Sequence, residues 1–144
     1  MPLAKITLQD FRNHARSELV ETTHFNLLVG PNGAGKTNVL EAISLLAPGR
    51  GIRRARLGDL ARRENPDAPP GPFAIGASLV EQGQVSARLG TYTAQDAPNR
   101  RLVRINGAQA SASALSEWHA VSWLTPAMDG LFTDSAGVDR KSVV

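Results

Sequence analysis

Residues 30–37 read Gly-Pro-Asn-Gly-Ala-Gly-Lys-Thr, which is the pattern G-x-x-x-x-G-K-T of a phosphate-binding loop. The apolar segment from Phe25 to Val29 precedes this loop and is typical of a buried strand. After the loop, apolar residues recur at helical spacing, which predicts a helix from about Gly35 to Ala47. Strand, glycine loop and helix are the context that the motif requires, so the pattern predicts an α/β fold.

The residue types of the loop explain its chemistry. Glycines without a Cβ allow the main chain to approach a triphosphate, so we expect Gly30, Gly33 and Gly35 to adopt backbone angles that a side chain would forbid. Successive N–H groups and the helix N-terminus then surround the phosphates. We expect Lys36 to reach the β- and γ-phosphates and the Thr37 hydroxyl to bind Mg²⁺. The alternative is a glycine-rich turn that matches the pattern by chance. The predicted nucleotide-binding residues are Gly30, Pro31, Asn32, Gly33, Ala34, Gly35, Lys36 and Thr37.

Composition narrows the class of protein. The chain has 144 residues and is 42% hydrophobic, which suits one folded domain rather than a disordered segment. It has no cysteine, so disulfides and thiolate metal sites are excluded. No apolar run is long enough to span a bilayer, and residues 1–5 lack the apolar core of a signal peptide. We therefore expect a cytoplasmic protein without a membrane segment.

Arginines gather in one short segment after the predicted helix. Six of them lie between residues 50 and 63, with Asp59 as the acidic residue among them. The guanidinium group presents a planar fork of donors that suits phosphate recognition, as in nucleic-acid contacts. The alternative is a solvated surface loop, which is what most charge runs are.

The rest of the chain predicts mainly strands. Alternation of apolar and polar residues predicts strands at residues 4–11 and 16–21, and residues 57–61 are expected to form a short helix or turn. Four prolines make residues 65–72 a loop. Strands at residues 73–80, 84–91 and 100–105, joined by turn residues, predict an antiparallel meander. Ser113 is expected to cap a short helix that runs to His119, followed by a strand at residues 121–124.

Two elements of an ATP-hydrolysing site are missing after Lys36. There is no run of four apolar residues followed by Asp-Glu, which would hold Mg²⁺ and polarise the attacking water. There is also no stretch like Leu-Ser-Gly-Gly-Gln, with which a partner subunit would close on the nucleotide. We therefore assign no catalytic residue and expect the 144-residue chain to be inactive in hydrolysis.

Several stretches resemble a known family. Residues 8–13, Leu-Gln-Asp-Phe-Arg-Asn, and residues 27–43 around the loop resemble the ABC-type ATPases of the SMC and RecF group. Residues 49–56 and 123–133 are similar to the RecF family within that group. The resemblance runs from about Leu3 to Gly137. It implies the first lobe of an ABC-type ATPase head, carrying an antiparallel β meander.

The resemblance also implies a function. RecF members are weak DNA-dependent ATPases that form ATP-dependent homodimers at single-strand/double-strand DNA junctions, act with RecR and RecO, and support RecA loading and the SOS response. It would place Arg12 beside the phosphate loop. It would make Arg53, Arg54 and Arg56 the DNA-binding candidates and assign to one of them the role of coupling DNA binding to ATP. Arg56 is the nearest match for that role. The alternative is a stand-alone nucleotide-binding regulatory module without DNA binding.

The resemblance ends before the chain does. Residues 138–144, Val-Asp-Arg-Lys-Ser-Val-Val, depart from the arginine-rich helix start of the family. Their last six residues are also what one reading frame of a sequencing-library adapter encodes. We therefore expect residues 1–137 to be a partial ATP-binding lobe and residues 138–144 to be a non-native tail, the alternatives being a genuine short protein or a frameshifted gene.

Overall fold

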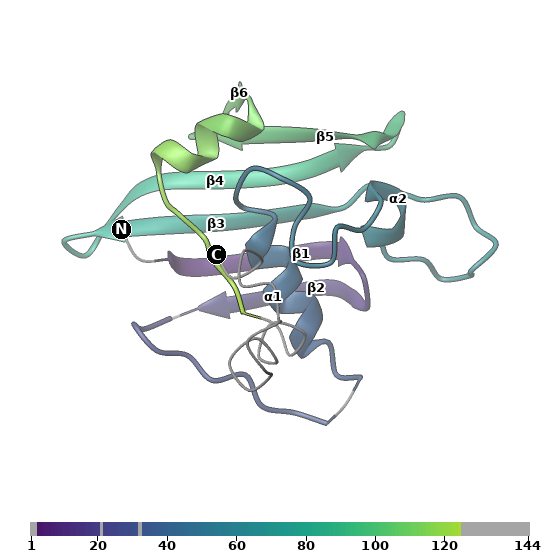
Figure 1. The fold of residues 1–144 in the computed structure, drawn as a ribbon, viewed down its shortest axis with the longest axis horizontal. Helices are drawn as coiled ribbons and strands as arrows, with labels where there is room; N and C mark the ends of the chain where they lie inside the picture. The colour runs from purple at the N-terminus through teal and green to yellow at the C-terminus, as the bar shows by residue number, and fades with distance from the viewer. Residues whose placement is uncertain (1–2, 21, 32, 125–144) are drawn as a thin grey trace, which may run out of the picture.

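The computed structural model describes residues 3–20, 22–31 and 33–124, and its described strands form one antiparallel sheet (Figure 1). The strand order is β2-β1-β3-β4-β5-β6. The strands are β1 (Leu3–Phe11), β2 (His14–Val20), β3 (Ala74–Glu81), β4 (Gln84–Ala94), β5 (Ala97–Ile105) and β6 (Ala108–Ala110). The helices are α1 (Lys36–Ser44), α2 (Leu57–Leu60) and the 3₁₀ helix η1 (Ala112–Glu117).

The meander formed by β3, β4 and β5 confirms the prediction from alternation. Every second residue of β3 is buried, including Ile75, Ala77 and Leu79. Asn106 and Gly107 have φ angles of 52° and 83°, which the tight turn between β5 and β6 requires. The turn signals and the side-chain period therefore predicted the buried face, whereas β4 ends at Ala94 rather than residue 91 and β5 begins at Ala97 rather than residue 100.

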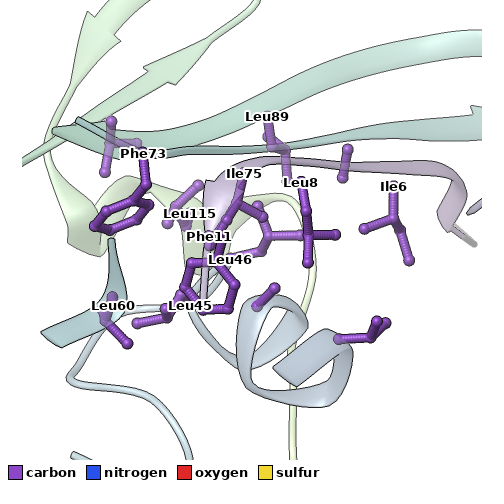
Figure 2. Close-up of a cluster of buried hydrophobic side chains, with 14 of the residues drawn as sticks. Ile6, Leu8, Phe11, Leu45, Leu46, Leu60, Phe73, Ile75, Leu89 and Leu115 are labelled. Carbon is purple, nitrogen blue, oxygen red and sulfur yellow. The ribbon is translucent and has the colours of Figure 1, made fainter. Parts of the chain in front are cut away.

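The helices pack on one face of this sheet. Apolar residues of β1 and β3 point toward α1, as Figure 2 shows for Ile6, Leu8 and Ile75. Leu60 of α2 and Leu115 of η1 join the same buried cluster. None of the helices within the described residues is long and apolar enough to cross a membrane. The opposite face of the sheet carries no helix from the described part of the chain.

The predicted buried strand from Phe25 to Val29 is wrong. These residues form no strand, and the side chains of Phe25, Leu27 and Val29 are 94%, 87% and 82% exposed. The physical reason is the lack of a partner: among the described residues, no strand hydrogen-bonds to this segment. The segment instead runs as an irregular arm that leads into the phosphate loop.

Several other elements differ from prediction. Helix α1 ends at Ser44 rather than Ala47, because the next turn tightens and the Leu46 N–H bonds three residues back, to the Ile43 carbonyl, at 3.0 Å. The short helix near its predicted position is a 3₁₀ helix with Ser111 at its N-cap, so Ser113 does not cap it. Residues 121–124 form no strand. The predicted tail at residues 138–144 lies outside the described residues.

Candidate phosphate-binding site

Two glycines give the loop its path into α1. Gly33 and Gly35 have φ angles of 86° and 96°, in the left-handed region that favours glycine. A Cβ on Gly35 would also lie 2.6 Å from both Asn13 Oδ1 and His14 Nε2. Gly30 does not adopt a positive φ, so the expectation for this glycine was wrong. Gly35 is therefore the position at which the φ angle favours a glycine and an added Cβ would have to displace the side-chain ends of Asn13 and His14.

A hollow of about 200 Å³ lies over the start of α1. Its lining comes from the loop, the first helical turn and one arginine: Gly33, Gly35, Lys36, Thr37, Asn38 and Arg53. The Val39 N–H bonds back to the Gly35 carbonyl at 3.1 Å, so the turn before it leaves its N–H groups without helical partners. No acidic residue lies in that first turn. The hollow therefore combines donors, a helix N-terminus and two cations, a set that fits an anion.

Lys36 and Thr37 occupy the positions that phosphate and Mg²⁺ chemistry requires. The Lys36 ammonium donates a hydrogen bond to the Gly30 carbonyl, across the loop. The Thr37 side chain is exposed, and its hydroxyl has no hydrogen bond to any described residue. Both groups face the hollow, one as a cation and one as a free oxygen ligand. Of the other predicted residues, Pro31 and Ala34 are exposed, and Asn32 lies outside the described residues.

Two consecutive residues at the turn between β1 and β2 hydrogen-bond to the phosphate loop. Asn13 Nδ2 donates to the Gly33 carbonyl at 3.3 Å, and His14 Nε2 lies 3.1 Å from the Gly35 carbonyl. The other ring nitrogen of His14 lies 2.7 Å from Ser17 Oγ, which holds the ring in place. The family resemblance placed Arg12, in this turn, beside the loop. It assigned no role in the site to Asn13 or His14. Nothing in their spacing to the motif indicates the contact.

Glu41 joins this turn to the arginine segment. Its carboxylate is 1% exposed and accepts hydrogen bonds from Arg12 Nε at 2.9 Å and Arg12 Nη2 at 3.1 Å. Arg53 Nη1 donates to the same carboxylate at 3.2 Å and to Asn38 Oδ1 at 3.0 Å. Asn38 Nδ2 donates in turn to Asn13 Oδ1 at 2.7 Å. A buried acid in α1 thus holds Arg12 and Arg53, of which Arg53 lines the phosphate hollow.

The three DNA-binding candidates do not lie together. Arg53 is partly exposed, but it donates to the buried Glu41 and lines the phosphate hollow. Arg54 is exposed with a φ of 51°, and Arg56 is exposed at the N-cap of α2. Neither side chain has a hydrogen bond or ion pair with a described residue. The segment therefore presents one arginine to the loop and two to solvent.

Arg101 secures the far end of α1, and sequence reasoning missed it. Its guanidinium donates to the carbonyls of Leu45, Ala47 at 2.8 Å and Gly49 at 2.6 Å, and to Thr91 Oγ1 at 2.8 Å. Burial lowers the pKa of Arg101 from its ordinary value. A cation at this end of α1 also complements the negative end of the helix dipole. Arg101 thereby fixes the helix that carries Lys36 and Thr37 to the sheet.

Comparison with known sequences gives consistent relatives. Residues 2–123 match the family described as the RecF/RecN/SMC N terminal domain. The chain is 47% identical over 141 residues to the DNA replication and repair protein RecF of Rhizobium leguminosarum bv. trifolii, and 48% identical over 141 residues to that of Mesorhizobium japonicum. Each alignment covers 96% of this chain and 36% of the relative. The chain therefore spans about a third of the length of these relatives.

Comparison with solved structures shows the same fold. A structure from work on ATP-driven dimerization and DNA stimulated activation of SMC ATPases matches with a TM-score of 0.70 at 17% identity, covering 99% of this chain and 96% of that one. The structure of the recombination mediator protein RecF with ATP matches with a TM-score of 0.63 at 23% identity, covering 77% of this chain and 28% of that one. The predicted resemblance to the SMC and RecF group, and the first lobe of an ATPase head, are confirmed.

Proposed function

The chain belongs to the RecF/RecN/SMC N-terminal domain family, and from that premise we propose that residues 30–37 bind Mg-ATP within an ATPase of DNA replication and repair. One observation carries this proposal. Left-handed glycines lead directly into an uncapped helix, and Lys36 and Thr37 line the hollow beside it. The match to a RecF structure with ATP supports the same nucleotide.

The groups that line the hollow have proposed parts in nucleotide binding. The N–H groups of the first turn of α1 bind phosphate oxygens, and the Lys36 ammonium exchanges the Gly30 carbonyl for the β- and γ-phosphates. The Thr37 hydroxyl supplies an oxygen ligand for Mg²⁺, which when bound neutralises charge on the phosphates. Glu41 and Asn38 orient Arg53 on the wall of the hollow, where its guanidinium can meet a phosphate.

The proposed role of the whole protein is ATP-dependent DNA binding at single-strand gaps, in the cytoplasm, as a homodimer with RecR and RecO, in support of RecA loading and SOS induction. Similarity to RecF supports this proposal, and the chain corresponds to about a third of such a protein. Arg54 and Arg56 are the candidates for DNA phosphates, since both guanidinium groups are exposed. Arg53 would link them to the nucleotide, because it belongs to the same segment and lines the hollow.

The test uses a chimera in which the matched part of this chain replaces the corresponding third of the Rhizobium leguminosarum relative. Fluorescence anisotropy with a gapped duplex measures the DNA affinity with and without ATP, over a series of salt concentrations. Arg54→Ala with Arg56→Ala should lower the affinity and flatten the slope of log K against log salt by about 0.9 per lost contact. Arg63→Ala, which removes another exposed arginine, serves as the matched control. ATP binding without any DNA affinity would instead favour the stand-alone nucleotide-binding module.

A further inference from the structure

The face of the sheet opposite α1 carries rows of residues defined by strand register. One row runs from Lys5 of β1 through Ser78 of β3 to Arg88 of β4. The next row runs from Thr7 through Gly76 and Gly90 to Arg104 of β5. Because directly paired residues of antiparallel strands share a face, these side chains all lie on the side away from the core.

A shallow hollow of about 190 Å³ lies within these rows. Lys5 and Arg88 line it from strands on either side of β3, so their backbones lie about 10 Å apart at the usual strand spacing. Gly76 keeps the floor open, since a Cβ there would lie 2.8 Å from Thr7 Oγ1. Two long cationic side chains thus flank a floor that offers the hydroxyls of Thr7 and Ser78. The size and the donors suit one phosphate group.

Positive charge extends beyond the hollow. Arg16 and Lys5 lie on this face beside Glu18, which is 3.5 Å from the guanidinium of Arg16 and 3.6 Å from the ammonium of Lys5. Arg104 lies over the ring of Tyr92, with its guanidinium carbon 5.3 Å from the ring centroid. That contact holds the guanidinium while its N–H edges remain available to an acceptor. The described rows therefore hold several cations around a single carboxylate.

The span of these cations matches a nucleic-acid backbone. Arg16 on β2 and Arg104 on β5 are separated by four strand spacings, which is about 19 Å. One DNA strand presents a phosphate about every 3.4 Å along the helix axis, so this width spans more than one phosphate group of a backbone. A free phosphate ion would occupy the hollow alone and would leave Arg16 and Arg104 without a role.

We propose that the helix-free face of the sheet binds the sugar–phosphate backbone of DNA, with one phosphate held between Lys5 and Arg88 and the backbone continuing past Arg104. Contacts of this kind position DNA without reading its sequence. The inference rests on the proposed DNA-binding function and locates a surface for it. This surface is separate from the segment that carries Arg54 and Arg56, which lies beside the helices.

The experiment measures the salt dependence of DNA affinity for the chimera carrying Lys5→Ala and Arg88→Ala. Loss of two phosphate contacts should lower the slope of log K against log salt by about 1.8 and the affinity at 0.1 M salt by roughly 60-fold. The exchange Lys5→Arg with Arg88→Lys keeps both charges and should retain the slope. Arg63→Ala should change neither quantity by a comparable amount. Unchanged Mg-ATP affinity in each variant checks that the protein is folded.

Three outcomes would overturn the inference. If the double alanine variant keeps the slope and the affinity of the parent, the chimera binds DNA elsewhere, and the proposed function stands without this surface. If the variant loses affinity only for free inorganic phosphate, the hollow is a small-anion site. If the unaltered chimera binds no DNA under any condition, the proposed function fails together with the inference.

Discussion

Replacing Glu41 by alanine should destabilise the chain by about 3 kcal/mol. The bidentate pair with Arg12, whose side chain is 24% exposed, contributes about 2 kcal/mol as charge-assisted hydrogen bonds. The Arg53 contact contributes about 0.5 kcal/mol, because that side chain is 40% exposed and solvent screens it. Loss of the packed side-chain atoms supplies the rest. Glu41→Gln keeps the shape and one acceptor oxygen, so we expect a loss of about 2 kcal/mol.

Urea unfolding followed by circular dichroism measures this change. With a slope of about 2 kcal/mol per molar urea, Glu41→Ala should lower the midpoint by about 1.5 M. Glu64→Ala is the matched control, because Glu64 is exposed and has no ion pair within the described residues. The control should change the free energy of unfolding by less than about 0.5 kcal/mol.

A double-mutant cycle separates the ion pair from the packing. Arg12→Ala, Glu41→Ala and the double variant should give a coupling free energy of about 2 kcal/mol. A loss below about 1 kcal/mol for Glu41→Ala, or a coupling near zero, would refute the reasoning. Either result would mean that the free-energy cost of desolvating the buried Glu41 carboxylate cancels the free energy gained from its ion pairs with the arginines.

Three further predictions concern the same lobe. Arg101→Met should lower the free energy of unfolding, measured by urea titration, by about 3 kcal/mol, because the Thr91 hydroxyl and the carbonyls after α1 lose their hydrogen-bond donor. A loss below about 1 kcal/mol would contradict this role of Arg101. Gly35→Ala should weaken Mg-ATP binding at least tenfold by calorimetry, as the added Cβ collides with Asn13. Gly49→Ala is the control for this change, since Gly49 has a similar φ of 102° but open space, and equal losses would contradict the steric argument. The 144-residue chain should release no phosphate from ATP above a Lys36→Ala background, and release clearly above it would reveal a missed catalytic acid.

Local features explain what could be predicted. The meander follows from the alternation in β3 and β4 and from Asn106-Gly107, since each signal involves neighbouring residues. The phosphate loop likewise depends on spacing within eight residues, and its glycines set the path of the chain into α1. These parts of the fold needed no knowledge of distant contacts.

Distant contacts explain what could not be predicted. Glu41 meets Arg12 across 29 positions, and Arg101 meets Gly49 across 52 positions, so neither pairing leaves a periodic signal in the sequence. The apolar run from Phe25 to Val29 predicted a strand, but a strand also needs a hydrogen-bonding neighbour, and composition carries no information on that. Arg53 belongs to an arginine cluster for which the sequence left phosphate recognition and a solvated loop open, and its bond to the buried Glu41 could not be read from that cluster.

Binding of Mg-ATP to residues 30–37 is the central claim, and isothermal titration tests it most directly. The unaltered chain and the chimera should bind Mg-ATP with one site per chain, and Lys36→Ala should weaken binding at least tenfold by removing the charge that faces the β- and γ-phosphates. Lys5→Ala, a lysine on the opposite face of the sheet, should leave the affinity unchanged. Equal affinity in the parent and Lys36→Ala, or no binding in either protein, would contradict the account.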